Sequence, residues 1–142
     1  MSTLWKAKYL IGIAIICFTL CCLEKCYALS DKSYHMIADL SECDKELLDD
    51  PNYLVELLQI AATDYGFNVL DAMVHKFEPQ GVTAMLLLSE SHFSIHTWPE
   101  DGVATVDLFT CGDTKPESAV KYVRDKLGCK ADMMKLIHRR VK

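Results

Sequence analysis

The feature that most constrains this sequence is a polar segment, residues 90–100, that lies between two apolar runs. The first run, residues 84–88, has the length and composition of a buried strand. Residues 99–102, Pro-Glu-Asp-Gly, predict a turn, and residues 103–109 predict a second strand. This hairpin and its flanks bring together a serine, two histidines, a tryptophan, a carboxylate and a thiol. Such a collection indicates chemistry beyond packing.

The register of this hairpin predicts which residues face each other. If Trp98 pairs with Val103 across the turn, position 91 lies opposite about position 110. Cys111 then lies beside Ser91 on the neighbouring strand.

A shared metal ion is excluded by the spacing of His92 and His96. Four residues apart, they would suggest metal ligation on a helix. The alternation of Phe93, Ile95 and Thr97 predicts a strand instead, on which four residues span about 13 Å. We therefore predict no metal site here.

Three short words in the sequence carry a family resemblance: Ser89-Glu90-Ser91-His92, Ile95-His96-Thr97-Trp98-Pro99-Glu100 and Asp107-Leu108-Phe109-Thr110-Cys111-Gly112. In composition and spacing they resemble the prokaryotic S-adenosylmethionine decarboxylase proenzymes, which are pyruvoyl-dependent. Looser similarity extends from about residue 34 to about residue 139. The resemblance implies a self-processed carboxy-lyase that decarboxylates S-adenosylmethionine and supplies aminopropyl groups for spermidine biosynthesis.

Ser91, considered alone, is a serine that could simply cap a strand end. The resemblance implies self-cleavage between Glu90 and Ser91, in which the serine hydroxyl attacks the Glu90 carbonyl and converts the amide into an ester. Elimination then leaves dehydroalanine, which hydrolyses to a pyruvoyl group on the new fragment. This covalent cofactor forms a Schiff base with a substrate amine and accepts electrons as carbon dioxide leaves.

Three more residues acquire catalytic roles from the resemblance. His96 matches the histidine of processing and proton transfer, a task suited to a group that titrates near neutral pH. Cys111 matches the cysteine that protonates the substrate α-carbon after decarboxylation. Thr83 stands where family members carry a serine that assists processing, and it keeps the hydroxyl but adds a methyl group. His92 is interpreted as a structural histidine.

The resemblance also implies a substrate-binding set. Phe77 and Trp98 match rings that stack on adenine, and their faces would attract the nearby sulfonium. Glu100 matches a glutamate that accepts hydrogen bonds from the ribose hydroxyls. Without the resemblance, the two rings would be assigned to the core and Glu100 to a turn.

The distance between Ser91 and His96 predicts how many chains build the site. On a straight strand they lie roughly 16 Å apart, which is beyond side-chain reach. Either the strand bends sharply after Ser91, or His96 serves a serine on another subunit. We expect a symmetric homodimer with shared active sites, and the family resemblance implies the same.

Two other functions remain open. A pyruvoyl-dependent ornithine or arginine decarboxylase would use the same chemistry on another substrate. A non-catalytic, membrane-tethered regulatory paralogue is a further alternative, but we would expect it to have lost Ser91 or Cys111. Both residues are present.

Composition limits the domain count and the partners. The chain of 142 residues is long enough for one domain and a terminal extension, and its net charge of −5 makes nucleic acid a poor partner. Only Cys43, Cys111 and Cys129 fall in the domain, and none belongs to a C-x-x-C pair. We therefore expect reduced cysteines, as in an intracellular protein.

The N-terminal residues 1–33 are predicted to form a separate basic and apolar segment. Residues 9–23 carry no charge, a run that suggests a signal or a membrane anchor although it is shorter than the roughly 20 residues of a spanning helix. We expect the catalytic domain, residues 34–142, to lie in the cytoplasm and the protein to associate with the membrane through this run.

The order of predicted elements indicates the fold class. Strands are predicted at 34–40, 67–77, 83–89, 92–98, 103–109 and 131–140, with helices beginning at Pro51 and spanning 116–127. This order predicts an α+β fold, a two-layer sandwich of a mainly antiparallel sheet with helices on one face.

Overall fold

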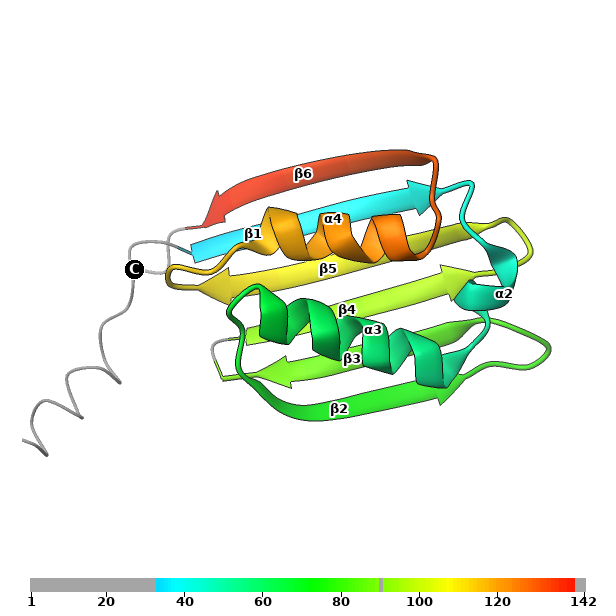
Figure 1. Cartoon of the computed structure of the whole chain (residues 1–142), viewed down its shortest axis with the longest axis horizontal. Coiled ribbons are helices and arrows are strands. Elements are labelled where there is room, and N and C mark those ends of the chain that lie inside the picture. Colours follow the sequence, from blue (N-terminus) through cyan, green and yellow to red (C-terminus); the bar gives the residue numbers. More distant parts are fainter. Residues whose placement is uncertain (1–32, 90, 140–142) are drawn as a thin grey trace, which may run out of the picture.

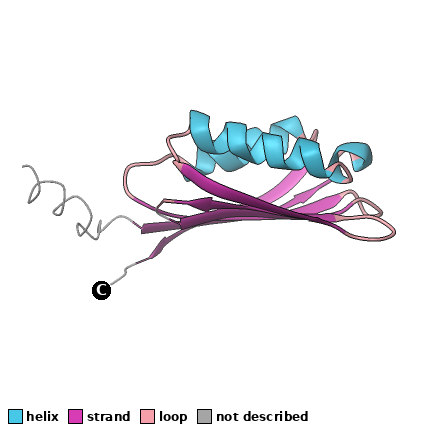
Figure 2. Ribbon diagram, turned by 90° about the horizontal axis from the view of Figure 1, so that it is seen from below, coloured by secondary structure: helices cyan, strands magenta, loops and turns pink. Residues whose placement is uncertain are grey.

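The computed structural model describes residues 33–89 and 91–139, which form a two-layer α+β sandwich. One six-stranded antiparallel sheet has the strand order β2-β3-β4-β5-β1-β6 (Figure 1). Figure 2 shows the helices together on one side of the sheet. The elements are β1 (Ser33–Ser41), α2 (Lys45–Leu48), α3 (Pro51–Asp64), β2 (Val69–Lys76), β3 (Val82–Leu88), β4 (Ser91–Trp98), β5 (Val103–Cys111), α4 (Pro116–Lys126) and β6 (Ala131–Arg139). The predicted fold class is confirmed.

The predicted strands and the predicted helix at 116–127 begin and end within two residues of the observed elements, and two differences have a physical reason. We expected the second strand to begin at residue 67, but β2 begins at Val69. Phe67 is instead buried, and its backbone N–H donates to the Ala62 carbonyl at the end of α3. Helix α2 was not expected, because four residues are too short for a periodic pattern. Predictions for residues 1–32, for Glu90 and for residues 140–142 lie outside the described residues.

Helix α3 begins where local sequence signals place it. The Asp50 carboxylate accepts hydrogen bonds from the backbone N–H groups of Asn52 and Tyr53, at 2.9 and 3.1 Å. Pro51 occupies the first turn, where its missing N–H costs no hydrogen bond. The helix then buries a stripe of apolar side chains against the sheet, namely Leu54, Leu57, Leu58, Ala61 and Ala62.

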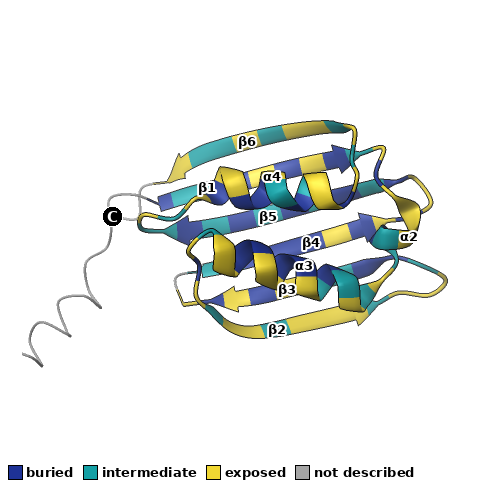
Figure 3. Ribbon diagram, viewed as in Figure 1, coloured by how far each residue is buried: buried dark blue, intermediate teal, exposed yellow. Residues whose placement is uncertain are grey.

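Successive side chains along each strand point to opposite faces of the sheet, one covered by the helices and one open. Phe93 and Ile95 of β4 point to the helix-covered face, where both are fully buried. In Figure 3, buried residues recur along the central strands, whereas β2 at the edge of the sheet is largely exposed. On the open face, which points away from the helices, large apolar side chains remain 37–69% exposed: Ile37, Met73, Met85, Leu87 and Met133.

Cys43 and Cys129 form a disulfide bond, so the expectation of reduced cysteines throughout the domain is wrong. The two cysteines are 86 residues apart in sequence. They meet because β1 pairs with β6, which sets Ser41 opposite Ala131 and brings together the loops beside them. Local spacing could not reveal a contact that depends on strand pairing.

No helix within residues 33–89 and 91–139 is long and apolar enough to cross a membrane. The apolar run 9–23 lies outside those residues.

Candidate active site

Ser91 is the first residue of β4, and its hydroxyl oxygen is buried. Only Ser89 and Glu90 separate β4 from the end of β3 at Leu88, and Glu90 lies outside the described residues. Within the described parts of the chain, the Ser91 Oγ has no hydrogen-bond partner. Buried hydroxyls are nearly always hydrogen-bonded, so this one requires an explanation. An unbonded hydroxyl is free to act as a nucleophile.

The predicted hairpin register is confirmed. Trp98 pairs with Val103, and the ladder between β4 and β5 then runs without a shift toward the start of β4. Extended by one position, this register sets Ser91 opposite Thr110, with Cys111 one residue further along β5.

The side chains of Ser91 and Cys111 nevertheless point to different faces of the sheet. Ser91 lies two positions before Phe93 and therefore shares its helix-covered face. Cys111 lies on the open face, where its Sγ is 3.4 Å from the hydroxyl oxygen of Ser33. The two residues meet at one end of the sheet, but the intact chain does not place the thiol against the hydroxyl.

His96 and Thr83 form a second pair, five residues along β4 from Ser91. They face each other directly across β3 and β4, and the His96 Nδ1 lies 2.8 Å from the Thr83 Oγ1. The hydrogen bond uses the hydroxyl that threonine shares with serine. The additional methyl group of Thr83 does not prevent the contact.

The predicted substrate-binding residues line a single hollow of about 280 Å³. Phe77 and Trp98 are 46% and 43% exposed there, so their ring faces are available for stacking. The Glu100 carboxylate accepts a hydrogen bond from the Gln80 side-chain amide at 3.0 Å. The hollow also includes Thr83 and His96, and we call it the nucleoside hollow.

Buried hydrogen bonds hold this end of β4 in place. The Thr97 hydroxyl donates to the Leu48 carbonyl of α2 and accepts from the Val82 N–H, both at 2.8 Å. The Gly81 N–H donates to the Asp49 carboxylate at 2.8 Å, and Gly81 has a φ of 101°, which favours glycine. The loop that carries Phe77 and Gln80 is therefore fixed to α2 and β4.

The two parts of the candidate site lie far apart within one chain. Strand β4 pairs residue by residue with β3 and with β5, without a register shift on either side. The sharp bend that would bring Ser91 to His96 is therefore not observed. The seven residue-to-residue steps from Ser91 to Trp98 span roughly 23 Å of strand.

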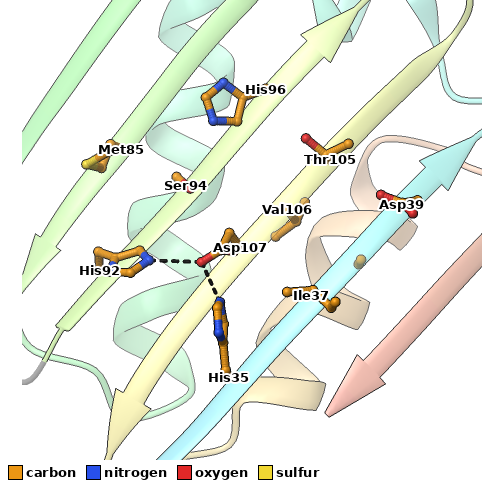
Figure 4. Close-up of a pocket in the computed structure, with 11 residues that line it drawn as sticks. His35, Ile37, Asp39, Met85, His92, Ser94, His96, Thr105, Val106 and Asp107 are labelled. Carbon is orange, nitrogen blue, oxygen red and sulfur yellow. Dashed lines mark hydrogen bonds and ion pairs between the residues drawn. The ribbon is translucent and has the colours of Figure 1, made fainter. Parts of the chain in front are cut away.

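A third cluster lies on the open face between these two parts (Figure 4). The Asp107 Oδ1 on β5 accepts hydrogen bonds from the Nε2 atoms of His35 on β1 and His92 on β4, at 2.8 and 2.9 Å. Burial raises the pKa of the Asp107 carboxyl, but the hydrogen bonds from His92 and His35 outweigh it, and the pKa lies below its usual value. The three side chains line an open-face hollow of about 690 Å³.

Comparison with known proteins assigns the family. A family model described as S-adenosylmethionine decarboxylase matches residues 34–140. This chain belongs to the S-adenosylmethionine decarboxylase family.

Relatives from both bacteria and archaea are similar to this chain. The S-adenosylmethionine decarboxylase proenzyme of Synechococcus sp. (strain WH7803) is 53% identical over 94 residues, which cover 66% of this chain and 73% of that protein. The proenzyme of Methanococcus aeolicus is 46% identical over 94 residues, 66% of this chain and 80% of that protein. The crystal structure of the adenosylmethionine decarboxylase from Aquifex aeolicus aligns with a TM-score of 0.74 and 35% identity, covering 80% of this chain and 94% of that one.

The residue chemistry at Ser91 fits the covalent cofactor that such a decarboxylase proenzyme requires. A pyruvoyl group arises from a serine whose hydroxyl is not engaged elsewhere, and the Ser91 Oγ is buried and unbonded among the described residues. It lies at a strand start, so cleavage before it leaves β4 whole.

Sequence reasoning missed several residues of this decarboxylase. Gln80 contacts Glu100, although nothing in its local sequence marks it. His35 was not considered, Asp107 was named only as part of a segment that resembles the family, and His92 was interpreted as structural only. Alternation on their strands places all three on the open face, but only the pairing of β1 with β5 shows that they meet.

Proposed function

We propose that this protein is an S-adenosylmethionine decarboxylase made as a proenzyme, which cleaves itself between Glu90 and Ser91 and then supplies decarboxylated S-adenosylmethionine for spermidine biosynthesis. The observation that carries this proposal is the buried, unbonded Ser91 hydroxyl at the start of β4, in a chain of this family. Residues 34–142 form the catalytic domain in this proposal.

Cleavage begins when the Ser91 Oγ attacks the carbonyl carbon of Glu90. A C–O bond forms and the amide C–N bond breaks, which leaves an ester and a free amine at residue 91. Elimination then releases residue 90 as a carboxylate, and hydrolysis of the remaining dehydroalanine releases ammonia. The products are fragments of 90 and 142 − 90 = 52 residues, less any residues removed from the N-terminus.

The two fragments stay interleaved after cleavage. The first contributes β1, β2, β3, α2 and α3, and the second contributes β4, β5, α4 and β6. Strand β1 of the first lies between β5 and β6 of the second, and β3 pairs with β4. Backbone ladders therefore hold the processed enzyme together without an intact peptide bond at residue 90.

The pyruvoyl group formed at position 91 supplies an electrophilic carbonyl that binds the substrate amine and accepts the electron pair released with carbon dioxide. Cys111 then donates a proton to the substrate α-carbon. His96 transfers protons, with Thr83 holding its Nδ1 through the 2.8 Å contact. This contact supports Thr83 as a processing aid.

The substrate is S-adenosylmethionine in this proposal, because the nucleoside hollow offers the groups that an adenosine moiety requires. Phe77 and Trp98 present partly exposed rings for the adenine, and Glu100 presents a carboxylate for the ribose hydroxyls. Ornithine and arginine have no group that would use these residues.

The active sites are shared between two chains of a homodimer. Within one chain, Ser91 and His96 are separated by roughly 16 Å of continuously paired strand. The open face carries the exposed apolar side chains that a partner sheet would cover. A two-fold axis on this face would place the nucleoside hollow of one chain near the Ser91 end of the other.

The location of the protein stays a prediction. The catalytic domain works in the cytosol, where its substrate is made, and residues 9–23 associate with the membrane. Cell fractionation with an antibody against the domain tests this point. Recovery of all the protein in the soluble fraction, with an intact N-terminus, would contradict the anchor.

Mass spectrometry of the purified, reduced protein tests the proposed function. We expect the two fragments and a pyruvoyl group on the smaller one, together with carbon dioxide release from S-adenosylmethionine in preference to ornithine and arginine. Reduction is required because the Cys43–Cys129 disulfide joins the two fragments. An active protein that consists only of intact chains would refute self-cleavage. Preference for an unmodified amino acid would support the alternative decarboxylase.

A further inference from the structure

We propose that His92, Asp107 and His35 act as a positioning clasp that fixes residue 91 relative to Cys111 in the processed enzyme. The proposal rests on the proposed function, because it concerns the geometry at the new end of β4. It assigns a role in the reaction to three residues that the sequence analysis left without one.

The clasp connects three strands of the sheet. His92 lies on β4, Asp107 on β5 and His35 on β1, and one oxygen atom, the Asp107 Oδ1, accepts from both histidines. Asp107 is not directly opposite either histidine in the strand register. Each histidine lies diagonally across from it, a distance that long side chains bridge.

The donors in this clasp can be assigned from elementary hydrogen-bond chemistry. A carboxylate only accepts, so the Nε2 atoms of both His35 and His92 carry hydrogen. The Arg139 guanidinium only donates, and its Nη1 lies 3.3 Å from the Nδ1 of His35. His35 is therefore the neutral tautomer that accepts at Nδ1 and donates at Nε2, and the chain of donors runs from Arg139 through His35 to Asp107.

An aromatic ring fills the space between the two histidines. Phe109 pairs directly with His92 on one side and with His35 on the other. Its ring centroid lies 6.3 Å from that of His92 and 5.9 Å from that of His35. The Arg139 guanidinium lies over the same ring at 5.1 Å. These contacts restrict the rings to the orientation that the two hydrogen bonds use.

The clasp lies next to the reacting residues. His92 directly follows Ser91, and Asp107 and Phe109 precede Cys111 on β5 by four and two residues. Cleavage removes the covalent link between β3 and β4, and new chain ends fray unless they are tied down. His92 is the first side chain after the cut that bonds to another strand. Its bond to β5 therefore keeps position 91 in register with the strand that carries the proton donor.

Binding of a metal ion is not an alternative role for these residues. Within residues 33–89 and 91–139, no group of His, Cys, Asp and Glu side chains is arranged to hold one. The distances of 2.8 and 2.9 Å from the Asp107 oxygen are those of direct hydrogen bonds to the ring nitrogens.

The test compares matched substitutions of His92 in the full-length protein. His92→Leu removes the donor, whereas His92→Gln keeps an N–H group at a similar reach. We expect His92→Leu to lower kcat about tenfold or more, the effect of losing a charge-assisted hydrogen bond, while the KM for S-adenosylmethionine changes little. His92→Gln should retain most of kcat, and Asp107→Leu, which removes the acceptor, should resemble His92→Leu.

The control is Ser94→Ala, which changes a side chain on the same strand and face without removing any hydrogen bond within the described residues. The double variant His92→Leu with Asp107→Leu should lose no more kcat than Asp107→Leu alone, because that single substitution already removes the hydrogen bond from His92. Equal melting temperatures and equal sizes on gel filtration would separate this loss from misfolding. If His92→Leu misfolds, the nearly isosteric Asp107→Leu carries the test.

The proposal is overturned if His92→Leu and Asp107→Leu turn over like the wild type. It is also overturned if Ser94→Ala or His92→Gln shows the same loss of kcat. Failure of the proposed function looks different, because the wild-type chain itself would then neither cleave nor release carbon dioxide.

Discussion

The two ends of β4 carry different parts of the candidate site and are built differently. At the Trp98 end, the buried Thr97 hydroxyl ties β4 to α2 and to β3, and the hollow for the nucleoside is already formed. At the Ser91 end, the reacting hydroxyl is buried and, among the described residues, makes no hydrogen bond. A binding surface gains from being rigid before the substrate arrives. A residue that must break its own peptide bond gains from having no competing partner.

The largest expected effect concerns the separation of these two ends. Ser91→Ala should remain an intact chain without activity, because no nucleophile is present at the cleavage site. His96→Ala should also be inactive. Co-expression of the two variants should restore part of the activity, since a mixed dimer contains one site with Ser91 from one chain and His96 from the other. Carbon dioxide release from the co-purified mixture measures this recovery.

The control for complementation is a mixture of the two variants purified separately. If the co-expressed chains form mixed dimers, shown with two different tags, and still have no activity, the shared site is wrong. Activity from His96→Ala alone would instead remove His96 from the reaction.

A second prediction separates cleavage from turnover at the Ser91 end. Cys111→Ala should still process, because Ser91 and Cys111 point to different faces of the intact sheet. Its decarboxylation rate should fall about 100-fold, the usual effect of losing a positioned proton donor. Protonation at the wrong carbon would convert the cofactor into an amine. Mass spectrometry of the smaller fragment before and after turnover detects that change, and an unmodified fragment with a normal rate would contradict the role.

A third prediction concerns the Trp98 end alone. Glu100→Gln and Phe77→Ala should raise the KM for S-adenosylmethionine about tenfold each, because each removes roughly one binding contact. Self-cleavage should be unchanged, because neither residue takes part in the proposed cleavage chemistry. Gln80→Ala should raise the KM less, because Gln80 acts only through its 3.0 Å hydrogen bond to Glu100. Slower cleavage in these variants would show that the two ends are not independent.

The smallest expected effect on catalysis comes from the disulfide, which lies outside both parts of the site. Cys43 belongs to the fragment 1–90 and Cys129 to the fragment 91–142, so the processed wild type should run as one linked species on a denaturing gel without reductant. Cys43→Ser should give two separate fragments. The free energy of unfolding of the unprocessed Ser91→Ala chain should fall by about 2–4 kcal/mol when the disulfide is removed, with kcat of the processed enzyme unchanged. Two separate wild-type bands under oxidising conditions would contradict the covalent link.

Much of the fold could be predicted because its signals are local. Asp50 and Pro51 mark the start of α3, and alternation marks β4 and β5. The hairpin register followed from one turn, and the structure confirms it. Helix α2 could not be predicted, since four residues show no period. The Cys43–Cys129 bond was missed for a different reason, because it depends on the pairing of β1 with β6.

The sequence by itself predicted which residues react, since the segments around Ser91, His96 and Cys111 resemble those of the family. Only the tertiary structure decided how these residues are distributed in space. It placed the Ser91 hydroxyl and the Cys111 thiol on different faces, and it assembled His35, Asp107 and His92 across three strands. The physical reason is that side-chain direction along a strand is a local property, whereas the neighbour across the sheet depends on which strands pair. In this chain β1 lies between β5 and β6. That strand order brings together the residues of the clasp and the two cysteines of the disulfide.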